Sequence, residues 1–333
     1  MSRSVHSGIQ PEQLKSWLPV DALVSDGRPV IEWMDLRDVD FAEPFFNETL
    51  ARVNANGLRQ RVLTEFDFLV QLETSLDSLE PSGFIFHASR CGSTLLANAC
   101  RALKGSVVIA EAPILDKIIS RLFTDAERNS AKELLYLVFL RAAVKALGQR
   151  RRGDERHYFI KFACTSTLQM SRIRRIWPMV PFVFLYRDPV EIVASNLRSI
   201  PEWMQPESNP KTAAAIVGVD VSELTTLAPE EYCARALGRF FLEADGNREL
   251  NTKLLNYDQL TSEMLINTLA FFGVGPSSDE VDEIREVSRH YSKDLSRSQI
   301  FHADGEAKRA SVSLSVIEMV EQWALPPYKR LNC

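Results

Sequence analysis

Short apolar runs alternate with amphipathic, helix-forming segments from Gly83 onward. The runs are rich in aromatic and β-branched residues and have the length of buried strands. They comprise residues 84–88, 106–110, 158–162, 181–186 and 253–257. Strands that alternate with helices are typical of a parallel sheet covered on both faces. The pattern therefore predicts an α/β fold, a three-layer domain with a central, mostly parallel sheet flanked by helices.

Helix start signals fall between these runs. Pro113 follows the second run and suits the first position of a helix. Ser130 with Glu133, and Asp188 with Glu191, have the spacing of a capping box. Each pair predicts that a helix begins there.

The first 80 residues have a different pattern. Residues 29–53 mix aromatic and acidic side chains without a clear period, and a polar run then leads to Pro81. We expect residues 1–80 to form an N-terminal extension packed on a main domain of residues 81–333. Three aromatic side chains of the extension are interpreted as core rather than site: Trp33, Phe45 and Phe46.

Composition narrows the class of protein. The chain has 333 residues, of which 45% are hydrophobic and 25% charged, as in ordinary folded globular proteins. A formal net charge of −5 gives no general attraction to nucleic acid or to an anionic membrane, so neither is expected as a partner. An anion site must therefore be built from a few placed cations.

The cysteines and the N-terminal residues indicate in which cellular compartment the protein is expected. The chain has 5 cysteines, an odd number without paired spacing, which favours reduced thiols. The first residues lack an apolar segment of signal-peptide length. We expect a cytoplasmic protein. The 5 histidines are scattered and no C-x-x-C occurs, so no metal site is expected.

The turn after the first apolar run carries the first chemical signal. Compared with the ATP-binding pattern G-x-x-x-x-G-K-[ST], Gly92 and Thr94 match, while His87 replaces the first glycine and Ser93 the lysine. A helix N-terminus still offers unpaired N–H groups to an anion. Arg90 adds a guanidinium that suits phosphate or sulfate. The alternative is a tight turn whose polar residues only cap the helix.

A second strand-turn-helix unit spans residues 182–199. Arg187 ends the strand, and Ser195 follows eight residues later, about two helical turns on. Both side chains could reach one phosphate along the helix flank. The alternative for Arg187 is a surface ion pair with Asp188 or Glu191.

Together the two units resemble the sulfotransferases that use 3′-phosphoadenosine 5′-phosphosulfate (PAPS), which have a P-loop-like α/β fold. The resemblance covers roughly residues 83–310. The Arg187 and Ser195 pair matches the family's 3′-phosphate motif, and Tyr257 in "LLNYDQL" would lie near the adenine. An arginine in the loop is similar to the bacterial and Golgi-type branches. The family's 5′-phosphosulfate loop, roughly P-[KR]-S-G-T-T, corresponds to Ser89, Arg90, Cys91, Gly92, Ser93 and Thr94.

The chain departs from the family pattern at several positions. Ser89 replaces proline, Cys91 replaces serine and Ser93 replaces threonine. Cys91, at a helix N-terminus, is expected to have a lowered pKa. The C-terminal R-K-G segment of the cytosolic branch is absent, and "FHADGEAKRAS" is expected to supply Lys308 or Arg309 to the 3′-phosphate instead.

The resemblance implies transfer of a sulfuryl group from PAPS to a hydroxyl or amine of an acceptor. The reaction would need no metal, because Arg90 would stabilise the negative charge that develops on the leaving phosphate. Glu111 is the preferred base, because it ends the second strand and follows Arg90 by 21 residues, a spacing similar to that in tyrosylprotein sulfotransferases. The alternative is that Glu111 caps the helix at Pro113. His87 is the rival base, with a suitable pKa, and His302 is a weaker candidate.

Other interpretations stay open. A P-loop kinase or ATPase is disfavoured by Ser93, which stands where lysine is needed. A nucleotide-binding module without turnover is compatible with the substitutions in the loop. Residues 149–157 form a basic cluster, interpreted as a solvated loop or as a contact for an acidic acceptor. Residues 199–215 could form a lid, or Trp203 could pack on the domain.

Overall fold

The computed structural model describes residues 11–57, 59–124, 129–290 and 312–333. Among these residues, five strands form a parallel sheet, and each predicted strand is confirmed to within one residue at either end. In spatial order they are β5 (Ser106–Ala110), β6 (His157–Lys161), β4 (Gly83–His87), β7 (Phe182–Tyr186) and β8 (Thr252–Asn256). The predicted α/β class is confirmed.

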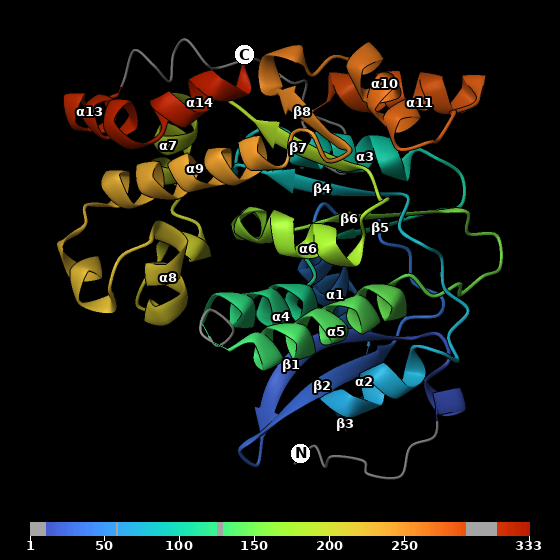
Figure 1. The fold of residues 1–333 in the computed structure, drawn as a ribbon. Coiled ribbons are helices and arrows are strands. Elements are labelled where there is room, and N and C mark those ends of the chain that lie inside the picture. Colours follow the sequence, from blue (N-terminus) through green and yellow to red (C-terminus); the bar gives the residue numbers. More distant parts are fainter. Residues whose placement is uncertain (1–10, 58, 125–128, 291–311) are drawn as a thin grey trace.

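Helices cover both faces of this sheet (Figure 1). Ile85 and Val108 belong to a core cluster with α3, α10 and α11, whereas Phe84 and Phe86 belong to the larger cluster on the other face. On the first face are α3 (Ser93–Arg101), α10 (Ser262–Phe271) and α11 (Ser278–Arg289). On the second are α4 (Pro113–Thr124), α5 (Ser130–Leu147), α6 (Met170–Ile176), α7 (Pro189–Arg198) and α9 (Pro229–Gly246). The sheet is therefore the middle of three layers.

Further helices pack around α4 and α9. The helix α8 (Pro210–Val217) contacts α4 and α9, and α13 (Leu314–Trp323) and α14 (Leu325–Leu331) pack against α9. Trp203 packs on Tyr232 and Phe240, with ring centroids 6.1 and 6.0 Å away. This favours the packing interpretation of Trp203. No helix within the described ranges combines the length and apolar character needed to cross a membrane.

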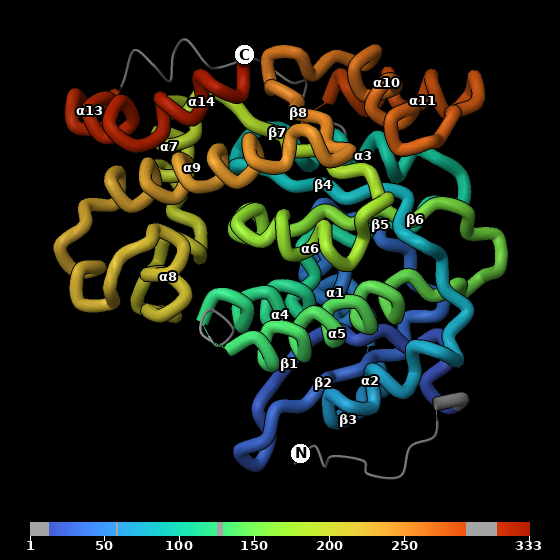
Figure 2. The backbone as a smooth tube through the Cα atoms, viewed as in Figure 1, coloured from blue at the N-terminus to red at the C-terminus, as the bar shows by residue number. Residues whose placement is uncertain are grey.

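The N-terminal region contains a sheet that the sequence analysis did not predict. In the described part of this region, β1 (Trp17–Ser25), β2 (Arg28–Asp35) and β3 (Arg61–Glu65) pair antiparallel, with α1 (Phe46–Ala55) and α2 (Phe66–Leu72) beside them. The tube in Figure 2 shows this sheet next to α4 and α5, away from α10 and α11. Its side chains share one core cluster with the second face of the parallel sheet. The division at residue 80 stays a prediction.

The structure corrects one predicted helix cap and refines another. Asn129, not Ser130, caps α5, because its side chain accepts hydrogen bonds from two backbone N–H groups of the first turn. Asp188 caps α7 as predicted, but Glu191 turns to Arg187 instead of completing a capping box. Pro113 opens α4 as predicted.

Candidate active site

Polar side chains gather at the carboxyl ends of the parallel strands. His87 ends β4 and Lys161 ends β6, while Glu111, Arg187 and Tyr257 directly follow β5, β7 and β8. The carboxyl edge is where open α/β sheets bind ligands. The strand order puts β4 between β6 and β7, so the turn after β4 lies at the centre of this edge.

The turn between β4 and α3 has unusual backbone geometry. Ser89 (φ 67°), Arg90 (φ 49°) and Gly92 (φ 82°) are all left-handed, a conformation that is uncommon for non-glycine residues and that clusters at active sites and ligand-binding turns. Turns of this kind direct backbone N–H groups to one side and bind anions. The first turn of α3, with buried Ser93 and Thr94, contains no acidic side chain. The turn is therefore suited to an anion.

Tyr257 joins the two predicted phosphate motifs. A Cβ on Gly92 would lie 3.0 Å from the Tyr257 ring and 2.6 Å from Leu260, so only glycine lets this segment pack so closely. The Arg187 guanidinium lies 4.1 Å from the centre of the same ring. Arg187 also pairs with Glu191, but both side chains are buried, so the predicted surface ion pair is wrong in its location.

A buried asparagine ties the turn to α7. Asn196 is fully buried, and its Oδ1 accepts hydrogen bonds from Ser89 Oγ (3.3 Å) and Arg90 Nε (3.4 Å). Arg90 also donates to the backbone oxygen of Ser199 at 3.2 Å. Ser195 lies half-buried beside Asn196. Sequence analysis missed Asn196, although an asparagine on the apolar face of an amphipathic helix was a visible signal.

A cation, a carboxylate and an imidazole meet beside the turn. The Lys161 ammonium pairs with Glu111 Oε1, and His87 Nε2 lies 3.4 Å from the same oxygen. The Lys161 side chain is 1% exposed and that of Glu111 26% exposed. Sequence analysis missed Lys161, whose signal was a lone lysine closing an apolar strand. The structure thus brings both predicted base candidates together around a residue that was not predicted.

This cluster sets the protonation of its members. Burial by itself would raise the pKa of Glu111, but the charge of Lys161, and then the neighbouring His87, outweigh it and hold that pKa at about 2. Burial lowers the pKa of His87, against the opposing effect of Glu111. His87 Nδ1 accepts a hydrogen bond from the Ser89 N–H at 3.1 Å, so the neutral ring carries its proton on Nε2, toward Glu111. At neutral pH the site holds an ionised Glu111 and a neutral His87.

Asp116, in the first turn of α4, is a second carboxyl group close to Glu111. Within the described ranges its Oδ1 is buried and has no hydrogen-bond partner. Burial, and then the charge of Glu111, raise the pKa of Asp116 well above its ordinary range. Both effects favour the neutral form of this carboxyl group, and sequence analysis missed Asp116.

Cys91 lies fully buried in the turn before α3. The expected low pKa of Cys91 is wrong, because burial raises the pKa of this thiol to about 12 and its Sγ donates to the Leu185 carbonyl oxygen. Lys308, Arg309 and His302 lie outside the described residues. Among the residues that are described, no group of three or more His, Cys, Asp or Glu side chains could hold a metal ion. A metal-free reaction stays a prediction.

Comparisons with known proteins complete the description. No family model matches this chain, and no curated protein matches it either. A sulfotransferase from Alicyclobacillus acidocaldarius is similar in structure, with 15% identity over 76% of this chain and 95% of that one, and a TM-score of 0.38. The sulfotransferase STF9 from Mycobacterium avium has 10% identity over 74% of this chain and 79% of its own, with a TM-score of 0.41. The sulfotransferase domain of the Synechococcus PCC 7002 olefin synthase has 15% identity over 74% of this chain and 96% of its own, with a TM-score of 0.34.

These three solved structures, to which the chain is similar, are sulfotransferases. The TM-scores lie below 0.5, so we base the functional proposal on the residues of the carboxyl edge described above.

Proposed function

We propose that this protein is a sulfotransferase that moves a sulfuryl group from PAPS to a hydroxyl or amine of an acceptor and releases adenosine 3′,5′-bisphosphate. One observation carries the proposal. The anion-binding turn, the Arg187 and Tyr257 pair, and the Glu111 and Lys161 pair all meet at one edge of the sheet. The first two suit the two anionic groups of the nucleotide, and the third suits removal of a proton.

The residues present fit the donor. The left-handed turn and the start of α3 would hold the 5′-phosphosulfate, through the donors of Ser89, Arg90, Cys91, Gly92, Ser93 and Thr94. Arg187 and Ser195 would hold the 3′-phosphate, and the Tyr257 ring, beside both Gly92 and Arg187, would lie against the adenine. Lys308 stays a candidate for the 3′-phosphate. PAPS, when bound, supplies an activated sulfuryl group.

Glu111 takes the proton of the acceptor in this proposal. Lys161 keeps Glu111 ionised, so a lone pair is available throughout the neutral range. The same ammonium places positive charge beside the oxygens on which negative charge develops during transfer. Arg90, held by Asn196 and Ser199, places a second cation at the turn. Positioning and charge stabilisation then account for catalysis, as in phosphoryl transfer.

The surroundings of His87 favour a supporting role over that of the base. Its Nδ1 already accepts the Ser89 N–H, and its protonated Nε2 faces Glu111. A neutral imidazole in this state has no lone pair to offer the acceptor. We therefore assign His87 to orienting Glu111 and the start of the turn.

A Glu111→Gln variant tests the proposal. We expect release of adenosine 3′,5′-bisphosphate from PAPS, measured with a panel of hydroxyl and amine acceptors, to fall by about 10²–10⁴-fold, because the base is lost. The dissociation constant of the bisphosphate should not change. Glu249→Gln, an exposed change before β8, is the matched control. Full turnover in Glu111→Gln would refute the assignment of the base.

The two alternative functions give different results in the same assay. A P-loop kinase or ATPase would turn over ATP in the presence of Mg²⁺ and leave PAPS intact. A binding module would bind the bisphosphate with no turnover in the wild-type protein. Either result would replace the sulfotransferase proposal.

A further inference from the structure

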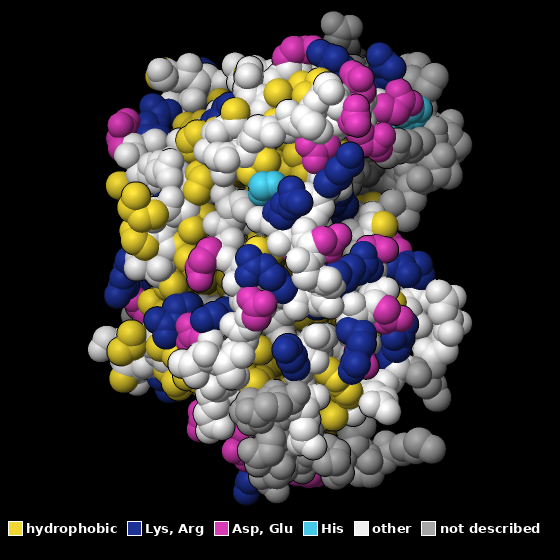
Figure 3. All heavy atoms as spheres, turned by 90° about the vertical axis from the view of Figure 1, so that its right-hand side faces the viewer, with side chains coloured by type: hydrophobic (Ala, Val, Ile, Leu, Met, Phe, Trp, Pro, Cys, Tyr) yellow, Lys and Arg dark blue, Asp and Glu magenta, His cyan; other side chains and the backbone are white. Residues whose placement is uncertain are grey.

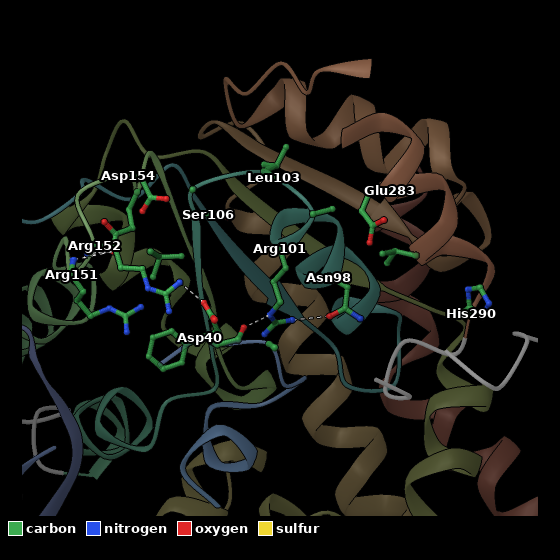
Figure 4. Close-up of a pocket in the computed structure, with 17 residues that line it drawn as sticks. Asp40, Asn98, Arg101, Leu103, Ser106, Arg151, Arg152, Asp154, Glu283 and His290 are labelled. Carbon is green, nitrogen blue, oxygen red and sulfur yellow. Dashed lines mark hydrogen bonds and ion pairs between the residues drawn. The ribbon is translucent and has the colours of Figure 1, made fainter. Parts of the chain in front are cut away.

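The segment from Leu36 to Phe45 joins β2 to α1, and we call these residues the 36–45 strap. Its first half is held by an arginine from the loop between α5 and β6. Arg151 Nη1 donates to the backbone oxygens of Leu36 (2.7 Å) and Val39 (2.8 Å). Figure 4 shows this arginine beside Arg152 and Asp40. Hydrogen bonds from a charged donor to backbone oxygens fix the path of the strap.

Further arginines hold the middle of the strap. Arg101, at the end of α3, donates from Nε to the Phe41 oxygen at 3.0 Å, and Arg152 donates from Nη1 to Asp40 Oδ1 at 2.6 Å. The Arg151 guanidinium lies 4.7 Å from the centre of the Phe41 ring. The side of the molecule that carries the α5–β6 loop shows Lys and Arg side chains gathered across its middle (Figure 3). The basic cluster of the sequence analysis is therefore an anchor for the strap.

The strap runs from the amino ends of the parallel strands to their carboxyl ends. Phe41 lines a cavity of about 510 Å³ together with Ser106, the first residue of β5. Phe45 lies at the opposite end, where the Lys161 ammonium is 4.7 Å from the centre of its ring. In the sheet, Lys161 is the register partner of Ala110, the last residue of β5. The strap thus delivers an aromatic ring of the N-terminal region to the carboxyl edge.

We propose that the N-terminal region is a working part of the active site, in which Phe45 is a positioning residue that holds the Lys161 ammonium against Glu111 and shields it from water. A cation over an aromatic face is attracted most strongly when water is excluded, and Lys161 is almost fully buried there. Without the ring, water would reach the ammonium and the lysine side chain would gain freedom. The claim about turnover rests on the proposed function, whereas the claim about shielding does not.

Chemical labelling tests the shielding without any assay of activity. In Phe45→Ala, we expect reductive methylation of Lys161, measured by mass spectrometry of the folded full chain, to be about 10-fold faster than in the wild type, in line with loss of a buried cation–aromatic contact. Phe66→Ala is the matched control, since Phe66 belongs to the same region but packs on Phe139. Equal methylation of Lys161 in the wild type and in Phe45→Ala would overturn the proposal.

Kinetics test the positioning. Phe45→Leu keeps an apolar side chain and loses the ring, so kcat should fall about 10-fold while the dissociation constant of adenosine 3′,5′-bisphosphate stays unchanged. Phe45→Tyr keeps the ring and should restore kcat to within about twofold of the wild type. Equal losses in Phe45→Leu and Phe66→Leu, or no rescue by Phe45→Tyr, would overturn the proposal. If the wild type shows no sulfuryl transfer, the proposed function fails, and the methylation result still decides this inference.

Discussion

The two halves of the carboxyl edge are built in different ways. The nucleotide half consists of the turn after β4 with Arg187 and Tyr257, and it depends on backbone geometry and local motifs. The transfer half consists of Glu111, Lys161 and their neighbours, and it depends on buried charges brought together by strand order. The difference predicts that changes in the first half weaken nucleotide binding, while changes in the second half affect stability, protonation and turnover.

Removal of Lys161 should have the largest effect. Lys161→Met leaves Glu111 without its cation in a mostly buried site, and loss of one partner of a buried pair costs about 3–5 kcal/mol of unfolding free energy. Thermal unfolding should show a fall in Tm of roughly 6–15 °C. Lys132→Met, an exposed change in α5, is the control and should leave Tm nearly unchanged. A fall of similar size in both variants would contradict the buried-pair account.

The next largest effect should be a change in stability with pH that arises in the transfer half, at Glu111. The pKa of Glu111 is lowered from 4.5 to about 2, so the group adds stability that is present above pH 4.5 and is lost as the pH falls through 2. The contribution is about 3 kcal/mol. Urea unfolding of the wild type and Glu111→Gln between pH 6 and pH 2 measures it. The difference in unfolding free energy between them should shrink across that window, and a constant difference would contradict the assignment.

Arg187→Lys should act on the nucleotide half alone. The change keeps the positive charge but loses the planar fork, so the dissociation constant of adenosine 3′,5′-bisphosphate should rise by about 10–100-fold. Arg198→Lys, at the exposed end of α7, is the control. Titration calorimetry measures the dissociation constant of the bisphosphate in both variants. Unchanged affinity in Arg187→Lys would remove Arg187 from the nucleotide site.

Asp116→Asn should have the smallest effect. Burial and the charge of Glu111 raise the pKa of Asp116 and favour its neutral form, so a neutral amide of similar shape should change the unfolding free energy by about 1 kcal/mol or less at pH 7. Thermal unfolding at pH 7 measures the change. A loss of the size expected for Lys161→Met would mean that Asp116 is ionised and that Lys161 serves two carboxylates.

The same contrast explains what the sequence could predict. The strands, the turn at Gly92 and the segment around Arg187 each follow from a pattern of neighbouring residues. The sequence therefore predicted where these strands and turns lie along the chain. Glu111 and His87 were identified separately, but β6 lies between their strands and its last residue, Lys161, joins them. Strand order is not written in any local pattern, so this link was missed.

The N-terminal region was missed for a related reason. The second strand, β2, is buried at every residue from Val30 to Met34, so side chains on both of its faces are covered and no alternating pattern remains to reveal it. Phe45 was interpreted as core because an aromatic residue in a sequence gives no sign of a distant cation. Its contact with Lys161 depends on the path of the 36–45 strap.

The most direct test of the account is thermal unfolding with adenosine 3′,5′-bisphosphate, compared with ATP plus Mg²⁺. At 100 times its dissociation constant the bisphosphate should stabilise the protein by about 2.7 kcal/mol. For a chain of this size that corresponds to a rise in Tm of roughly 5–10 °C. The account predicts this rise with the bisphosphate and without any metal ion. A rise only with ATP and Mg²⁺ would contradict it and would favour a kinase or ATPase.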